Sequence, residues 1–270
     1  MRYKLSAPAT LHTTIQLPAS KSISNRALIL HALAQGHIAP SNLSDCDDTR
    51  VMIKALDGNP GHIDILAAGT AMRFLTAYLS VTPGTRIITG TERMQQRPIR
   101  ILVDALRELG AQIEYAGKEG FPPLRITGTE LTGEEISLAG NVSSQYISAL
   151  LMIGPILKNG LRLNLTGEII SRPYINLTLQ LMKEFGADAA WSSESSITVR
   201  PGKYRDIPFT VESDWSGASY WYQMVALIQD NEKKESTKTE IKLPGLLPRS
   251  YQGDSRGAEI FAKLGVHTTY

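Results

Sequence analysis

The chain contains one pattern three times: a helix start made of small residues, followed by an arginine 28 residues later. The pairs are Ser22 and Arg50, Gly69 and Arg97, and Ser144 and Arg172. Each start, such as SKSISNRALILHAL or AGTAMRFLTAYLS, runs into an apolar stretch with helical spacing. A helix N-terminus leaves N–H groups without intrahelical partners and carries partial positive charge, so it suits phosphate and carboxylate groups. The repeat therefore predicts a site for a small molecule with two or three negative charges.

Further helices and short strands are expected between these starts. A second helix is predicted at 98–110 and at 173–186, because proline suits the first position of a helix and glycine the position after its end. The stretch TRVMIKALDG after Asp48 is a shorter copy. Strand-like runs lie at 86–90, 112–115, 124–127, 161–165, 196–200 and 208–211. This alternation predicts an α/β fold built from three repeated units between about residues 21 and 211.

A fourth unit begins after this domain. Its expected elements are a helix start at 215–227, a solvated polar loop at 230–240 and a second helix at 255–266. Three complete units followed by one incomplete unit would be an unusual fold. We therefore expect residues 212–270 to begin a second three-unit domain, which is cut short or supplied by another chain.

Composition excludes several classes of partner. The net charge is only +2, so no global field favours nucleic acid. The single cysteine, Cys46, can form neither an intramolecular disulfide nor a cysteine-rich zinc site, and the five histidines lack metal-ligand spacing. No segment matches a signal peptide or a membrane span. These features predict a cytoplasmic protein that binds small molecules, without contact to membrane or nucleic acid.

Candidate cationic residues stand at the helix starts. Lys21, Ser22 and Arg26 lie within about one helical turn, so they can converge on one anion. Gly69 lets a ligand approach the backbone closely. Arg97 directly precedes a helix, where the dipole disfavours a cation, so a ligand-directed role is plausible for it. Helix capping and solvated surface charge remain the structural alternatives at each of these positions.

A second group offers hydroxyl and amide groups. Ser143, Ser144 and Gln145 suit a phosphate or sugar-like hydroxyls, and Ser171 and Tyr174 could act similarly. Here too, helix capping is the alternative explanation.

Taken together, the ordered segments resemble the EPSP synthases, the 3-phosphoshikimate 1-carboxyvinyltransferases. The matching motifs are SKSISNRAL, AGTAMRF, ERMQQRPI, VSSQY, SRPYI, VESDWSGASY and QGDSR. The resemblance implies two domains, each an inside-out α/β barrel of three repeated βα units, with residues 1–20 adding a strand to the second, here incomplete, domain. It also implies enolpyruvyl transfer from phosphoenolpyruvate to shikimate 3-phosphate without a metal or cofactor, and a monomer at full length.

The resemblance assigns roles to the candidate residues. Lys21 would be catalytic, contacting the phosphoenolpyruvate phosphate and assisting proton transfer. Shikimate 3-phosphate would be bound by Lys21, Ser22, Arg26, Ser143, Ser144, Gln145, Ser171 and Tyr174. Phosphoenolpyruvate would be bound by Lys21, Gly69, Arg97 and Gln145, where glyphosate-like inhibitors also bind.

The chain departs from the family pattern behind the phosphoenolpyruvate pocket and near its end. Phe74 and Ala67 stand where the family usually has proline and asparagine, which leaves inhibitor sensitivity open. The catalytic aspartate and glutamate of the family lie beyond Tyr270. We therefore expect this polypeptide alone to have little or no activity.

Three alternatives remain. The chain could bind shikimate 3-phosphate without turning it over. It could transfer enolpyruvate to a UDP-amino sugar on the same fold, although that family uses a cysteine within an Arg-Pro-Gly-Cys-type loop and Cys46 lies in SDCDD. An unrelated repeat scaffold would bind no anion at all.

Overall fold

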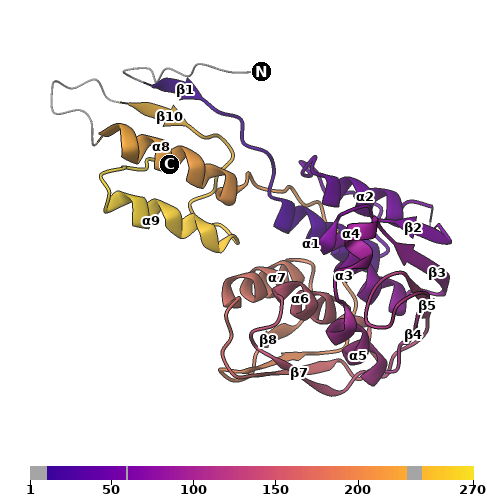
Figure 1. Ribbon diagram of the computed structural model, residues 1–270. Coiled ribbons are helices and arrows are strands. Elements are labelled where there is room, and N and C mark those ends of the chain that lie inside the picture. Colours follow the sequence, from indigo (N-terminus) through magenta and orange to yellow (C-terminus); the bar gives the residue numbers. More distant parts are fainter. Residues whose placement is uncertain (1–10, 59, 230–238) are drawn as a thin grey trace. The chain divides into compact units, whose positions relative to one another are not determined.

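The computed structural model describes residues 11–58, 60–229 and 239–270, which form two compact units. One unit is Lys21–Val211, and the other combines the described part of Met1–Ser20 with Glu212–Tyr270. Figure 1 labels the elements of both. The helices are α1 (Lys21–Leu33), α2 (Asp47–Leu56), α3 (Gly69–Ser80), α4 (Glu92–Gln95), α5 (Arg100–Glu108), α6 (Ser144–Ile153), α7 (Arg172–Glu184), α8 (Trp215–Gln229) and α9 (Gly257–Ala262), with 3-10 turns η1 (Gly154–Ile156) and η2 (Gly253–Arg256).

The strands of the larger unit form two four-stranded sheets with the same topology. These strands are β2 (His62–Asp64), β3 (Gly84–Thr89), β4 (Gln112–Tyr115), β5 (Leu124–Gly128), β6 (Glu135–Ala139), β7 (Leu161–Thr166), β8 (Ala189–Trp191) and β9 (Ser196–Val199). The smaller unit contains β1 (His12–Thr14) and β10 (Glu240–Lys242). One sheet has the order β2-β3-β5-β4 and the other β6-β7-β9-β8. In both, the first pair is parallel and the other two pairs are antiparallel. Apart from the short extra helix α4 in the first copy, the order β-α-β-α-β-β thus occurs twice, which confirms the predicted α/β fold built by repetition.

The helices that follow the small-residue starts form the centre of the larger unit. Nearly every residue of α3 and α6 is buried, as are Ile23–Leu30 of α1. A helix that is buried all round belongs inside a core. The three helices pack against one another, and the two sheets lie at the periphery of this unit, with α3 and α6 between them (Figure 1). Because α1, α3 and α6 pack together in this way, their N-termini lie in one region.

Glycine and proline residues mark the limits of α5 and α7, the second helices of their repeats. Gly110 and Gly186 follow α5 and α7 with φ angles of 99° and 90°, a conformation that favours glycine. Pro173 lies in the first turn of α7, as predicted. Pro98, by contrast, lies two residues ahead of α5 and is not its first residue. The N–H of the intervening Ile99 donates to Gly120 O at 2.9 Å, so the chain there is held by a distant loop.

The strand predictions need one correction. Residues 208–211 do not form a strand: Thr210 makes only an isolated bridge with Ser41. Pro208 and, in the partner segment, Pro40 lack an N–H, so a longer ladder could not form. The first repeat therefore consists of α1 and α2 without a four-stranded sheet among the described residues. The predicted loop at 230–240 lies outside the described residues except for its last two, of which Glu240 begins β10.

The smaller unit has its own core. Strand β1 pairs in parallel with β10, and α8 packs against α9. Trp215 is 2% exposed and is clustered with Ala218, Tyr222, Val225 and Val266. Trp191 and Trp221 are only half-buried. No helix within the described ranges is long and apolar enough to cross a membrane.

Candidate active site

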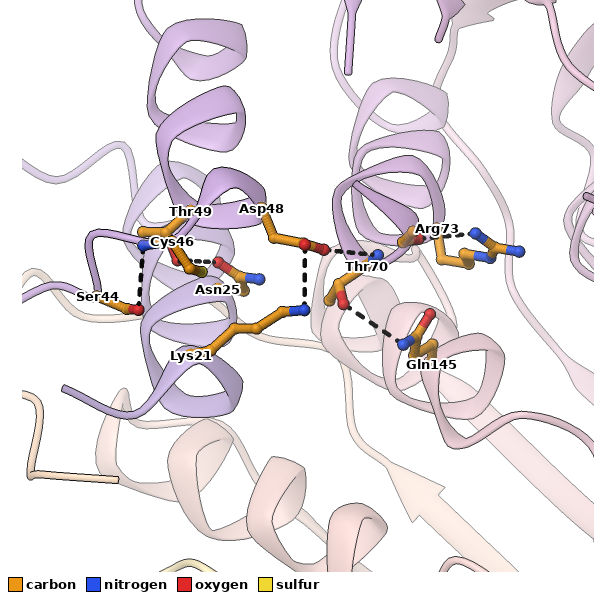
Figure 2. A network of polar contacts seen from close by, with 10 residues as sticks. Lys21, Asn25, Ser44, Cys46, Asp48, Thr49, Thr70, Arg73 and Gln145 are labelled. Atoms are coloured by element: carbon orange, nitrogen blue, oxygen red, sulfur yellow. Dashed lines mark hydrogen bonds and ion pairs between the residues drawn. The ribbon is translucent and has the colours of Figure 1, made fainter. Parts of the chain in front are cut away.

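Three helix starts meet in one polar network, shown in Figure 2. Lys21 begins α1, and its Nζ lies 3.1 Å from Oδ2 of Asp48 in the first turn of α2. The other carboxylate oxygen of Asp48 accepts from the backbone N–H of Thr70 at the start of α3, at 3.1 Å. Thr70 Oγ1 in turn accepts from Gln145 Nε2, at the start of α6, at 3.4 Å. The network therefore joins the N-termini of α1, α3 and α6.

Gly69 and Arg97 are in direct contact at the same helix start. A Cβ on Gly69 would lie 2.5 Å from Arg97 Nη1, so only glycine leaves room for this guanidinium. Arg97 is exposed, and its guanidinium has no hydrogen-bond acceptor or ion-pair partner in the part of the chain that the structure describes. A cationic fork lying against a helix N-terminus is suited to binding a phosphate or a carboxylate.

Arg73 adds a buried cation beneath this position. It is 5% exposed, and its Nη1 donates to Gly69 O at 3.0 Å. Burial lowers the pKa of Arg73, and the nearby Arg97 cation also lowers it, whereas Tyr146 and Asp48 act in the opposite direction. The first turn of α3 is thus flanked by two arginines, one buried and one exposed, which makes it strongly electropositive.

Arg26 lies in the interior, with only 3% of its surface exposed. Its guanidinium donates to Thr178 Oγ1 at 2.7 Å, to Ser148 Oγ at 2.9 Å and to Ser22 O at 2.9 Å, and it lies over the Phe74 ring. No described carboxylate pairs with it, and burial lowers its pKa to about 10. A buried cation without a paired anion is costly, so the site favours an incoming negative charge.

The remaining predicted residues lie at the starts of α6 and α7. Ser143 caps α6 by accepting from Gln145 N at 3.3 Å, so the capping explanation applies to it. Ser144 is half-buried in the first turn of α6. Ser171 directly precedes α7, and Tyr174 lies exposed in its first turn. The backbone oxygen of Tyr174 accepts from Thr178 Oγ1 at 2.8 Å, and this hydroxyl also accepts from Arg26. The Tyr174 phenol opposes the burial effect on the Arg26 pKa.

The other two arginines of the 28-residue pattern are held by other contacts. Arg50 lies 4.0 Å from exposed Asp45. Arg172 lies over the Trp191 ring and donates to Glu194 O at 2.6 Å. Of the three arginines, it is Arg97 whose guanidinium lies against a helix start.

Sequence reasoning missed Asp48 and Arg73 as parts of the site. Asp48 is in the first turn of a helix, where an acidic residue needs no further explanation, and its partners are far away in sequence. Arg73 falls within an apolar helix and gave no local signal. The signal that could have found Asp48 is the buried N-terminus of α3, because Ala68 at its N-cap position has no side-chain acceptor and an outside oxygen is needed.

The role of Asp48 as an external cap can be tested by its effect on stability. Asp48→Ala is expected to lower the free energy of unfolding by about 1–2 kcal/mol, because the Thr70 N–H loses its acceptor. Asp45→Ala is the matched control, since Asp45 is exposed and contacts Arg50 only at 4.0 Å. Urea unfolding measures both variants. Equal stability of the two variants would contradict the capping role.

The sequence profile of the EPSP synthases (3-phosphoshikimate 1-carboxyvinyltransferases) matches residues 5–58 and 59–270. The chain belongs to the EPSP synthase family. Over 270 residues it is 72% identical to the 3-phosphoshikimate 1-carboxyvinyltransferase of Bacteroides fragilis. The aligned region covers 100% of this chain and 64% of that protein. It is 39% identical to the protein of the same name from Shewanella halifaxensis. That alignment covers 93% of this chain and 64% of that protein.

Solved EPSP synthases share the fold. Two structures from Acinetobacter baumannii superpose with TM-scores of 0.70 and 0.73, at 23% and 22% identity. They cover 81% and 88% of this chain and 54% and 57% of those chains. The chain therefore spans a little under two thirds of the length of the EPSP synthases it matches by sequence.

Proposed function

We propose that this chain takes part in enolpyruvyl transfer from phosphoenolpyruvate to the 5-hydroxyl of shikimate 3-phosphate, with release of phosphate. The observation that carries the proposal is the meeting of three helix N-termini in one network, which includes Lys21 paired with Asp48 and lies beside Arg97 at Gly69. Both substrates are phosphorylated carboxylates, and an electropositive region of this kind stabilises their charges without a metal.

In the proposed reaction the 5-hydroxyl oxygen attacks C2 of phosphoenolpyruvate, a proton adds to C3, and the hydroxyl proton is lost. The resulting tetrahedral ketal then loses its phosphate group and one proton from C3, which leaves the enol ether. Lys21 is the proposed catalytic residue, with its ammonium oriented by Asp48 at 3.1 Å. Arg97 and the Gly69 backbone would hold the phosphoenolpyruvate phosphate, and Gln145 would lie between the substrates.

The proposed shikimate 3-phosphate site lies along the starts of α1, α6 and α7. Its residues are Lys21, Ser22, Arg26, Ser143, Ser144, Gln145, Ser171 and Tyr174. The buried Arg26 supports this assignment, because the carboxylate or phosphate of a ligand would compensate a charge that no described acid pairs with.

Calorimetry on the 270-residue chain tests the proposal. We expect heat from binding of shikimate 3-phosphate, followed by binding of phosphoenolpyruvate to the complex. A parallel phosphate-release assay separates turnover from binding alone. Lack of binding of either ligand would contradict the proposal, and binding of a UDP-amino sugar in their place would favour transfer to that class of acceptor.

Four further expectations remain predictions. The two compact units are proposed to be parts of the two domains of the family fold, with the limits 1–20, 21–211 and 212–270. The cytoplasmic location and the monomeric state at full length are predicted from sequence and resemblance, and the absence of a cofactor is an implication of the family.

A further inference from the structure

The exposed guanidinium of Arg97 needs something other than its own hydrogen bonds to hold it in place. In the described part of the chain it has no acceptor, yet it lies against the backbone of Gly69. Its position must therefore come from the segment that carries it. The N–H of Arg97 donates to Met94 O at 3.0 Å, and the carbonyl of the next residue, Pro98, accepts from the Tyr146 hydroxyl at 2.8 Å.

Tyr146 belongs to the same turn of α6 as Gln145. Three contacts then close a ring: Tyr146 to Pro98, Arg97 to Gly69, and Gln145 to Thr70, the residue after Gly69. The Gln145 bond is long at 3.4 Å, and the Gly69 contact is one of packing. The short bond from Tyr146, which is 8% exposed, is thus the firmest link in the ring.

We propose that Tyr146 is a positioning residue of the anion site, whose hydroxyl ties the Arg97–Pro98 segment to the helix turn that carries Gln145. Arg97 and Gln145 then face the same turn of α3, at Gly69 and Thr70. The inference rests on the proposed function, since it assigns this turn to phosphoenolpyruvate.

The aromatic ring of Tyr146 has a separate role, which is to pack against Arg73. The guanidinium carbon of Arg73 lies 5.9 Å from the centre of this ring, and Arg73 donates to Gly69 O. The aromatic face supports the buried cation beneath the site. Tyr146→Phe keeps the ring and removes the hydroxyl, and with it the bond to Pro98 and the hydroxyl's influence on the Arg73 pKa. The variant therefore tests the hydroxyl apart from the ring.

Tyr204 provides a matched control within the same unit. It is 5% exposed, and its hydroxyl donates to Met152 O, near the far end of α6, at 2.8 Å. Tyr204→Phe thus removes a buried bond from a tyrosine to a backbone carbonyl at the same distance, but away from the anion site.

Calorimetry with phosphoenolpyruvate, in the presence of saturating shikimate 3-phosphate, tests the inference on the 270-residue chain and both variants. We expect Tyr146→Phe to raise the Kd of phosphoenolpyruvate by about 3- to 10-fold. The Kd of shikimate 3-phosphate should stay within about 2-fold of the original value, and Tyr204→Phe should change neither Kd. Both variants should lose similar thermal stability.

Two results would overturn the positioning role while leaving the proposed function intact. One is an unchanged Kd of phosphoenolpyruvate in Tyr146→Phe. The other is an equal weakening of both ligands, which is the signature of general loosening. If the original chain bound neither ligand, the proposed function would fail, and this inference would fail with it.

Discussion

Replacing Gly69 with alanine is expected to weaken phosphoenolpyruvate binding by about 10- to 100-fold, with little loss of stability. The added Cβ would lie 2.5 Å from Arg97 Nη1. The clashing atoms are the end of a flexible side chain, so the guanidinium can move away while the helix stays in place. Its charge-assisted bonds to the ligand phosphate would then be lost. Calorimetry measures the affinity, and thermal unfolding measures the stability.

Gly202→Ala is the matched control, because a Cβ at Gly202 meets nothing within 4 Å. It should leave both affinity and stability unchanged. Strong phosphoenolpyruvate binding in Gly69→Ala would contradict the assignment of Arg97 to the phosphate. A large loss of stability in that variant would show that the contact with Arg97 is mainly structural.

Lys21→Met is expected to weaken phosphoenolpyruvate binding by a similar factor, about 10- to 100-fold. The variant loses a cation that is 46% exposed in its side chain, and it leaves Asp48 without its ion-pair partner. The Asp48 carboxylate would still cap Thr70, but its negative charge would repel an incoming anion. Stability should change little, because the ion pair is partly solvated.

A double variant separates these two causes. Asp48→Asn keeps an oxygen for the Thr70 N–H and removes the charge, so Lys21→Met/Asp48→Asn should recover part of the affinity lost in Lys21→Met. Lys183→Met, at an exposed position near the end of α7, is the control for loss of one positive charge. If Lys183→Met weakened binding as much as Lys21→Met, only the net charge of the protein would matter, and the local site would be disproved.

Much of the fold could be predicted because its signals are local. The starts of α1, α3 and α6 are marked by small residues before an apolar run, and α5 and α7 each end two residues before a glycine at positive φ. Strands such as β7 and β9 place buried residues at alternate positions, with exposed or half-buried residues between them. Among the strands that escaped prediction, β2 and β8 have only three residues, too few to show a period. β6 was missed although its five residues alternate between exposed and buried.

The site itself could be predicted only in part, because its contacts are long-range. Lys21 and Gly69 stand at helix starts and were found there. Arg97 was found as a residue directly before a helix, whereas the structure places it three residues ahead of α5. The partners of these residues are Asp48 and Arg73. In the sequence alone, Asp48 is an ordinary acidic residue at a helix start and Arg73 an ordinary arginine within a helix. Their roles depend on how α2 and α3 pack, which no single segment of sequence reveals. The burial of Arg26 was likewise not predicted, because it results from the packing of three helices around one guanidinium.

A crystal structure of the chain with shikimate 3-phosphate and phosphoenolpyruvate tests the central claim most directly. The account predicts the phosphate of phosphoenolpyruvate at the start of α3, within hydrogen-bond distance of Arg97 and close to Lys21. A structure with the ligand phosphates bound elsewhere, and with Lys21 and Arg97 directed to separate surfaces, would contradict it.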